Sequence, residues 1–337
     1  MNKMIIKLII ACFLVLGTGL LVSRLAAAST GSESRLSAYR GWSDSVFLSN
    51  RSAEVIMVPQ VARVLHFSLR GMSNILWEDP AAGGQLQNPD SETTGEYVNY
   101  GGAKLWVAPQ SKWGTKWTVW PPFYGLDSGP CKSSIRKDGS VLLTGLDSRT
   151  AGVRIDRTAS LAKNSVSFVY TMSNISDKPV EWGIWMVANV KPGGRTFIPY
   201  VDNAELWSNE KDKKVPDSFA WKRQDGLLVM DFPEGKDGSK LFSLSAGGWL
   251  AYIVEGQAFF ITYTPDLKAV QPEGEAPTEI FRGKDFVELE HVGPLVKLSP
   301  GGTTSLTERW HLLKAPAISD PAALAAWVSK TAAKLPK

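Results

Sequence analysis

The sequence contains very little cysteine and very little histidine. Among its 337 residues there are only two cysteines, Cys12 and Cys131, and three histidines, His66, His291 and His311. We expect Cys12 to be removed with an N-terminal segment, so Cys131 has no partner for an intramolecular disulfide. A histidine-rich metal site needs two or three histidines close together, and these three are widely spaced. We therefore expect no metal site, no cofactor and a fold stabilised by a large buried core.

Several motifs that carry known chemistry are also missing. The chain has no His-Glu-x-x-His, no Gly-x-Ser-x-Gly and no glycine-rich phosphate loop. The Asp-Gly pairs at 138–139, 225–226 and 237–238 are typical of turns rather than of calcium loops. Motifs therefore give no support for a zinc protease, a serine hydrolase or a nucleotide-binding loop.

Only the N-terminus has a long apolar run. Residues 8–22 form 15 uncharged residues after Lys3 and Lys7, and three alanines follow at 26–28. This pattern is typical of a secretory signal peptide, and the run is shorter than the ~20 apolar residues of a membrane span. We predict that residues 1–28 are a cleaved signal peptide and that the mature protein is periplasmic or secreted. An uncleaved anchor and a lipoprotein signal at Cys12 are the alternatives.

The chain has no marked excess of positive charge once residues 1–28 are removed. Loss of Lys3, Lys7 and Arg24 leaves 34 basic against 33 acidic residues, although the pI of the full chain is 8.9. A protein with no net field does not attract nucleic acid or acidic lipid. We expect no nucleic-acid partner and no membrane span after cleavage, and the sequence leaves the oligomeric state open.

Short β-type runs fill most of the chain, and no 20–50-residue repeat relates them. Fifteen such runs lie at 46–48, 54–58, 63–69, 104–107, 141–144, 152–156, 166–172, 182–190, 227–232, 241–245, 249–254, 258–263, 286–290, 295–298 and 305–312. No helical periodicity separates them, which favours an antiparallel all-β domain over an α/β fold. We assign this domain to residues 40–315.

Flexible or helical segments flank the predicted domain. We predict a flexible segment over 29–39 and a helix within 316–337 that packs on the domain. Asp320 is a suitable N-cap, Pro321 fits the first helical position, and Leu324 and Val328 share a face with Trp327. The polar stretch around 83–98 is either a lid or a disordered loop.

Tryptophan is abundant and clustered. The chain has 13 tryptophans, and Trp106, Trp113, Trp117 and Trp120 fall within fifteen residues. Indole rings offer flat apolar faces that match the C–H faces of sugar rings. Polar side chains accompany them: Asn99, Tyr100, Lys104, Gln110, Lys112, Lys116, Tyr124 and Asp127. The segment therefore indicates carbohydrate binding, while simple filling of a large core is the alternative for each ring.

Two carboxylates form the best acid–base candidate. Glu288 and Glu290 are two residues apart in a predicted strand and point to the same face. They form either an acid–base site or a solvated edge.

The motif NYGGAKLWVAPQ at 99–110, with Trp120-Pro121-Pro122 and Leu126-Asp127, resembles an uncharacterised bacterial domain-of-unknown-function family in the galactose mutarotase-like superfamily. The turn at 174–180 and the segments 289–290, 298–302 and 308–310 resemble aldose 1-epimerase-like domains in the same order. This resemblance implies an antiparallel supersandwich with a sugar cleft on its concave face.

The resemblance also implies a chemistry, with one departure. Aldose epimerases use a Glu base and a His acid, and Glu290 matches the base. The position of the catalytic His falls near Trp185, whose indole cannot deliver a proton but offers a stacking surface. Lys104 lies where epimerases place a substrate-binding arginine. The resemblance therefore implies a mutarotase-like fold without the standard pair of catalytic groups.

These observations leave three alternative functions. The first is an exported carbohydrate-binding domain without standard epimerase chemistry, which uses Asn99, Tyr100, Lys104, Trp106, Trp120, Asp127 and Trp185. The second is a sugar epimerase or another carbohydrate-active enzyme, with Glu290 as general base and Tyr100 or Lys104 as acid. The third is a structural or interaction module of the cell envelope, because a fold alone does not fix function.

Overall fold

The computed structural model describes residues 31–87, 97–114, 120–200, 206–208, 220–233, 239–244, 247–266 and 268–337. The predicted signal peptide at 1–28 lies outside the described residues. So does the 88–96 part of the stretch predicted as a lid or a disordered loop.

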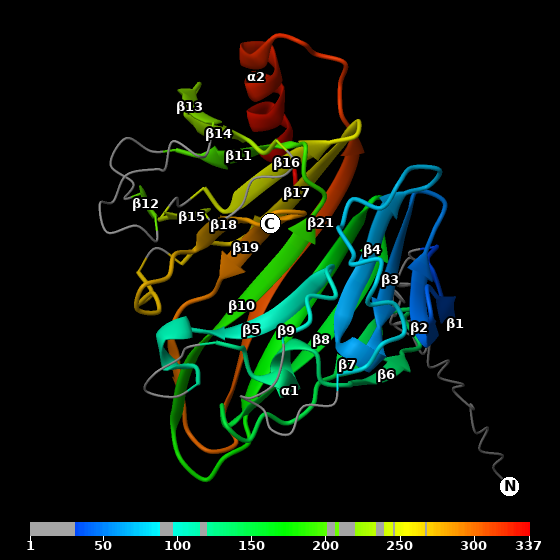
Figure 1. Cartoon of the computed structure of the whole chain (residues 1–337), viewed down its shortest axis with the longest axis vertical. Helices are drawn as coiled ribbons and strands as arrows, with labels where there is room; N and C mark the ends of the chain where they lie inside the picture. Colours follow the sequence, from blue (N-terminus) through cyan, green and yellow to red (C-terminus); the bar gives the residue numbers. More distant parts are fainter. Residues whose placement is uncertain are drawn as a thin grey trace, which may run out of the picture.

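Two large antiparallel sheets make up the molecule (Figure 1). The first sheet has the order β1-β2-β3-β4-β5-β10-β19-β18-β15-β12, and β20 pairs with β10. Its strands are β1 (Glu33–Tyr39), β2 (Trp42–Ser49), β3 (Ala53–Val58), β4 (Arg63–Leu69), β5 (Ala103–Ala108), β10 (Val180–Val190), β12 (Leu206–Ser208), β15 (Ser239–Ser243), β18 (Thr278–Arg282), β19 (Val287–Val292) and β20 (Val296–Leu298).

The second sheet has the order β13-β14-β11-β16-β17-β21-β9-β8-β7-β6. Its strands are β6 (Lys132–Ile135), β7 (Val141–Thr144), β8 (Val153–Ala162), β9 (Ser165–Asn174), β11 (Arg195–Pro199), β13 (Ala220–Gln224), β14 (Leu227–Asp231), β16 (Trp249–Val254), β17 (Gln257–Tyr263) and β21 (Thr303–Lys314). Each of the fifteen predicted runs overlaps a strand, so the all-β prediction is confirmed.

Alternation of apolar and polar residues explains the long strands β8 and β9. Every second side chain of β9 is buried, among them Val166, Phe168 and Tyr170, and the residues between them are partly exposed. Such period-two patterns bury one face of a sheet and solvate the other. The buried faces of both sheets contribute to one large apolar cluster, so the core lies between the sheets.

The middle of the first sheet has a different burial pattern. All residues of β5 and β19 are buried, as are all residues of β10 from Trp182 onward. One face of these strands packs in the core, so something else must cover the other face. Described residues before and after β5, including Trp113 and Phe123, supply part of that cover and belong to the same apolar cluster.

Short helices complete the fold. α2 (Pro321–Ala332) begins after Asp320, whose carboxylate accepts a hydrogen bond from Ala323 N at 2.7 Å, as predicted for an N-cap. Its buried side chains, including Val328, belong to one apolar cluster with residues of β11, β14, β16 and β17, and Figure 1 shows the helix beside this end of the second sheet. The other helices are α1 (Tyr124–Asp127), η1 (Pro59–Val61) and η2 (Gln110–Lys112). In the described ranges, no helix has the length and apolarity to cross a bilayer.

The prediction of a flexible segment over 29–39 is wrong for residues 33–39. They form the edge strand β1, which pairs with β2 from Glu33 opposite Ser49 to Tyr39 opposite Trp42. Most of its side chains are only partly buried or exposed, and Leu36 is 57% exposed. A strand at a sheet edge needs little apolar periodicity, because backbone hydrogen bonds to its neighbour hold it.

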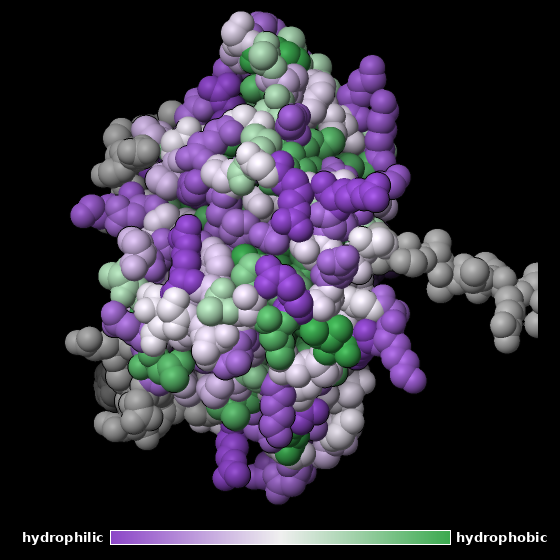
Figure 2. Space-filling model, turned by 90° about the vertical axis from the view of Figure 1, so that its right-hand side faces the viewer, coloured by the Kyte–Doolittle hydropathy of each residue, from purple (hydrophilic) through white to green (hydrophobic). Residues whose placement is uncertain are grey.

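The side of the molecule that carries the β1 edge presents a mostly hydrophilic surface. Figure 2 shows hydrophilic residues spread over this face, with apolar side chains in small separate patches. Scattered apolar residues are normal on a protein surface and do not by themselves mark an interface.

Candidate functional site

Strand register places a set of polar and aromatic side chains on one face of the first sheet. Residues directly opposite each other in antiparallel strands point to the same face. Trp106 of β5 lies opposite Trp185 of β10, and Val187 of β10 lies opposite both Lys104 and Glu290. Across β19, β18 and β15, the same face carries Glu288, Glu279, Phe281, Lys240 and Phe242.

A cavity of about 660 Å³ lies over this face. We call it the aromatic cavity, because seven of its lining residues are aromatic: Tyr97, Trp106, Trp120, Trp185, Phe242, Phe281 and Phe286. Its polar and charged lining consists of Asn99, Lys104, Gln110, Ser111, Lys240, Glu273, Glu275 and Glu288. The structure therefore brings together five of the predicted site residues: Asn99, Lys104, Trp106, Trp120 and Trp185.

Lys104 is the buried cation on one side of the cavity. Its Nζ donates to Glu288 Oε1 at 2.9 Å and to the Tyr97 hydroxyl at 2.8 Å, and it lies 4.5 Å from the Trp106 ring centroid. Burial alone would lower the pKa of the Lys104 ammonium, but Glu288, together with Tyr97 and Asp127, raises it above its ordinary value. Lys104 is therefore a fixed cation paired with Glu288.

Glu290 does not line the aromatic cavity. It is fully buried, and its Oε2 accepts hydrogen bonds from Trp185 Nε1 at 2.8 Å and from Lys240 Nζ at 3.1 Å. Burial raises the pKa of the Glu290 carboxyl, and the Lys240 ammonium only partly offsets that effect. Lys240 also contacts Glu279 Oε2 at 2.6 Å. The predicted general base is thus held in a buried carboxyl–ammonium–carboxyl triad beside the Trp185 indole.

The three predicted tryptophans differ in how much ring they offer. Trp185 has an exposed fraction of 0%, and Lys240 Nζ lies 4.4 Å from its ring centroid. Trp106 is 4% exposed and packs edge-on against Trp185 at 5.2 Å. Trp120 is 40% exposed and packs edge-on against Tyr97 at 4.7 Å. The open stacking surface expected at Trp185 is therefore absent, and Trp120 has the accessible ring.

Tyr100 and Asp127 lie elsewhere. Tyr100 lines a separate hollow with Trp42, and its hydroxyl accepts from Gln87 N at 3.0 Å. Asp127 is buried, with Oδ2 2.8 Å from Arg63 Nη2 and Oδ1 2.6 Å from Trp106 Nε1. Asp127 thus supports the cavity from behind Trp106, and neither residue contacts the aromatic cavity.

Eight further residues that line the cavity are not among those predicted from the sequence: Tyr97, Lys240, Phe242, Phe281, Phe286, Glu273, Glu275 and Glu288. Glu288 had a signal, because it shares a strand face with Glu290. Lys240 and Phe242 also alternate on one face of β15. The sequence cannot show that β15 and β18 lie beside β19, so these contributions become visible only with the sheet order.

The three histidines do not line the aromatic cavity. His291 directly follows Glu290, but strand alternation sends its side chain to the opposite face of β19. His66 and His311 lie on β4 and β21. In the ranges that the structure describes, no group of three or more His, Cys, Asp or Glu side chains has the arrangement of a metal site.

The fold is that of the galactose mutarotase-like sandwiches. A galactose mutarotase-like protein from Clostridium acetobutylicum is similar with a TM-score of 0.54 and 9% identity, covering 84% of this chain and 99% of that one. A galactose mutarotase-like protein from Lactobacillus casei has a TM-score of 0.52 and 12% identity, covering 80% and 100%. A putative aldose 1-epimerase from Escherichia coli has a TM-score of 0.51 and 14% identity, covering 80% and 98%. At these identities the similarity establishes the fold alone.

The chain belongs to the family described as domain of unknown function DUF4380, whose model matches residues 44–313. The predicted resemblance to an uncharacterised family of the mutarotase-like superfamily is therefore confirmed. No curated protein matches the chain.

Proposed function

We propose that this protein is an exported carbohydrate-binding protein that holds an uncharged sugar in the aromatic cavity. The observation that supports the proposal most directly is the lining of that cavity. The exposed Trp120 ring and the half-buried rings of Tyr97, Phe281 and Phe286 surround it, and buried charged groups lie at its floor. Flat apolar faces beside fixed hydrogen-bonding groups are what a sugar ring and its hydroxyls require.

The charges in the cavity favour an uncharged sugar over an acidic one. Lys104 is neutralised by Glu288, and Lys240 faces both Glu279 and Glu290. Glu273 and Glu275 add two more carboxyl groups to the lining. Carboxylates therefore outnumber ammonium groups, and like charges repel at short range. A uronic acid or a sugar phosphate is expected to bind more weakly than the parent sugar.

Standard epimerase chemistry has little support in this arrangement. A general base must be within hydrogen-bond reach of the proton that it removes. Glu290 is enclosed beside Trp185, and its Oε2 is already bonded to Trp185 and Lys240. Glu288 does line the cavity, but it is paired with Lys104. We therefore propose binding without mutarotation. The epimerase alternative is decided by polarimetry of fresh α-D-glucose: acceleration that Glu290→Gln abolishes would establish it.

Sugar binding is tested by tryptophan fluorescence and calorimetry with D-glucose, D-galactose, D-glucosamine and D-glucuronate. We expect at least one uncharged sugar to change the emission and to bind more tightly than glucuronate. Loss of the Trp120 ring removes a stacking contact worth ~1 kcal/mol, so Trp120→Ala should weaken binding about fivefold.

The matched control is Trp327→Phe, on α2 and remote from the cavity, which should bind as the unmodified protein does. The proposal fails if no sugar in a broad panel produces heat or a change in emission, or if Trp120→Ala binds with unchanged affinity. Export is tested separately, by sequencing the N-terminus of the protein recovered from its native host.

A further inference from the structure

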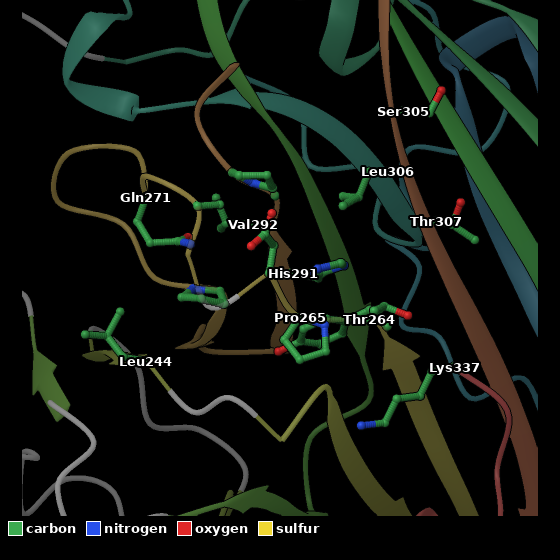
Figure 3. A pocket seen from close by; sticks show the side chains of 16 residues that line it. Leu244, Thr264, Pro265, Gln271, His291, Val292, Ser305, Leu306, Thr307 and Lys337 are labelled. Atoms are coloured by element: carbon green, nitrogen blue, oxygen red, sulfur yellow. The ribbon is translucent and has the colours of Figure 1, made fainter. Parts of the chain in front are cut away.

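A second cavity, of about 500 Å³, lies beside the opposite face of β19. Its lining includes His291 and Val292 of β19, Leu306 and Thr307 of β21, and Thr264 just after β17. Figure 3 shows the His291 imidazole in the middle of this group, between Leu306 on one side and Pro265 on the other. We call it the His291 cavity. It shares no lining residue with the aromatic cavity.

The His291 ring is rigidly held. Its Nδ1 lies 3.0 Å from Glu308 Oε2, and the other carboxylate oxygen accepts from the Tyr170 hydroxyl at 2.7 Å and from Trp310 Nε1 at 2.9 Å. The imidazole also stacks on Tyr263, with ring centroids 3.8 Å apart and 19° between the planes. His291 is 3% exposed and Glu308 0%. Stacking on Tyr263 therefore fixes the plane of the imidazole. The Glu308 carboxylate, itself held by Tyr170 and Trp310, fixes its position.

This arrangement leaves Nε2 as the free atom of the ring. A carboxylate oxygen accepts hydrogen bonds, so Nδ1 donates its hydrogen to Glu308, and Nε2 is the ring nitrogen left for a partner in the cavity. Nε2 has no hydrogen-bond partner among the described residues, and it is not one of their fully enclosed unpartnered atoms. It therefore faces the open space of the cavity.

The hydrogen bonds of the other two histidines differ from those of His291. His66 has Tyr39 Oη at Nδ1 and Ser68 Oγ at Nε2, at 3.3 and 2.8 Å. His311 has Ser165 Oγ at Nδ1 and Thr262 Oγ1 at Nε2, at 2.7 and 3.0 Å. Both ring nitrogens are satisfied in each case. At His291 only Nδ1 has a hydrogen-bond partner among the described residues, and Nε2 lies at the cavity.

We propose that the His291 cavity is a second ligand site, which binds a small uncharged molecule carrying a hydroxyl group. The ligand hydroxyl would form a hydrogen bond with Nε2, and Thr264 lines the same cavity. The charged lining residues are one Lys337 and one Asp266, whose formal charges cancel, so the cavity does not select an ion. The remaining walls are largely apolar, formed by Leu244, Pro265, Pro277, Val292, Pro294 and Leu306. This site does not depend on the function proposed for the aromatic cavity.

Diethyl pyrocarbonate, which acylates unprotonated imidazole nitrogens, tests the accessibility of Nε2. Peptide mass spectrometry of the folded protein follows each histidine separately. We expect His291 to react about tenfold faster than His66 and His311, whose nitrogens must first break a hydrogen bond. Equal or slower reaction of His291 would overturn the proposal, because Nε2 would then not face an accessible space.

Protection from acylation tests the ligand. The probes are glycerol, cyclohexanol and D-glucose, compared with sodium acetate and ethylammonium chloride at equal concentration. We expect at least one hydroxylated probe to slow the acylation of His291 about threefold or more, as occupancy of most sites requires, and the charged comparators to have no such effect. If no hydroxylated probe protects His291, or if the ions protect it equally, the proposal is wrong.

Two cavity variants and one remote variant locate the protection. Leu306→Trp fills the space while keeping both residues of the His291–Glu308 pair, and it should reduce both acylation and protection. Leu306→Met conserves volume and should behave as the unmodified protein does. Trp120→Ala, in the aromatic cavity, should leave the protection of His291 unchanged even though it weakens sugar binding. Protection that persists in Leu306→Trp, or that is lost in Trp120→Ala, would overturn a separate site.

Discussion

Asp127 shows how a single residue can support a cavity without contacting its contents. Its carboxylate bonds to Arg63 and to the Trp106 indole, and its backbone carbonyl accepts from Arg63 Nη1. Arg63 is 0% exposed and Asp127 is 2% exposed. The ion pair is therefore desolvated, and the partners depend on each other, since a lone buried charge is strongly unfavourable.

We predict that Asp127→Ala lowers the free energy of unfolding by about 3–5 kcal/mol, because it leaves the Arg63 guanidinium unpaired and the Trp106 N–H without an acceptor. Urea denaturation followed by circular dichroism measures this change. The matched control is Asp177→Ala, at an exposed position, which should alter stability by less than about 0.5 kcal/mol. A similar small effect in both variants would show that Asp127 is not the structural anchor described here.

The two glutamates of β19 show what residue-level reasoning can and cannot supply. Period-two alternation correctly predicts that Glu288 and Glu290 share a face, and the cross-strand register agrees. Which of the two reaches a ligand depends on their neighbours. Trp185 and Lys240 come from strands far away in sequence and enclose Glu290. No local pattern contains that information, so the predicted base could not be separated from its neighbour.

At the scale of elements, α2 covers one end of the second sheet. Ala325, Val328 and Ala332 pack with Phe197, Leu227, Val229, Trp249, Ala251, Ala258 and Phe260 from four strands. The sequence predicts this helix well, because its cap, its first-turn proline and its apolar face are all local signals. The helix thereby hides an apolar sheet face that would otherwise be exposed.

We predict that Asp320→Ala lowers the free energy of unfolding by about 1 kcal/mol, because the backbone N–H of Ala323 loses its side-chain acceptor. The control is Asp320→Asn, since asparagine caps helices about as well as aspartate does. Thermal and urea denaturation of the two variants give the comparison. Equal losses in both would mean that the effect comes from the charge rather than from the cap.

The sequence is least informative for strands at a sheet edge and for very short helices. β8 and β9 pair along ten residues and alternate regularly, so their pattern is visible in the chain itself. β1 is a strand only because β2 lies beside it. α1 has four residues, too few to display a helical period. These elements depend on tertiary contacts, which override weak local preferences.

At the scale of the whole molecule, strands distant in sequence are neighbours in space. β10 lies between β5 and β19, which are separated by almost 180 residues of chain. One apolar cluster includes residues from both sheets. Such interleaving means that neither half of the chain completes a sheet on its own. A perturbation in either sheet therefore acts on the stability of the same folded unit.

Two histidines, the partly buried His66 in the first sheet and the buried His311 in the second, make the stability of this unit depend on pH. Burial lowers the pKa of His66 to about 4, helped by Arg40, Lys191 and Arg70, and burial also lowers the pKa of His311 to about 4, helped by Arg309. Both side chains gain protons on unfolding below their ordinary pKa of about 6.5. The unfolded state then binds more protons than the folded state, so these groups reduce stability as the pH falls from about 6.5 towards 4.

We predict that His311 accounts for a loss of about 2 kcal/mol in the free energy of unfolding between pH 7 and pH 5. His311→Gln keeps an amide near Ser165 and Thr262 but cannot titrate, so its stability should fall by about 2 kcal/mol less over the same interval. Urea denaturation of both proteins at the two pH values gives this double difference. The difference is needed because Glu279 and Glu290 have raised pKa values, so these carboxyls act in the opposite direction. Their contribution is the same in both proteins and cancels. An unchanged pH dependence in His311→Gln would show that His311 is not kept neutral by the fold.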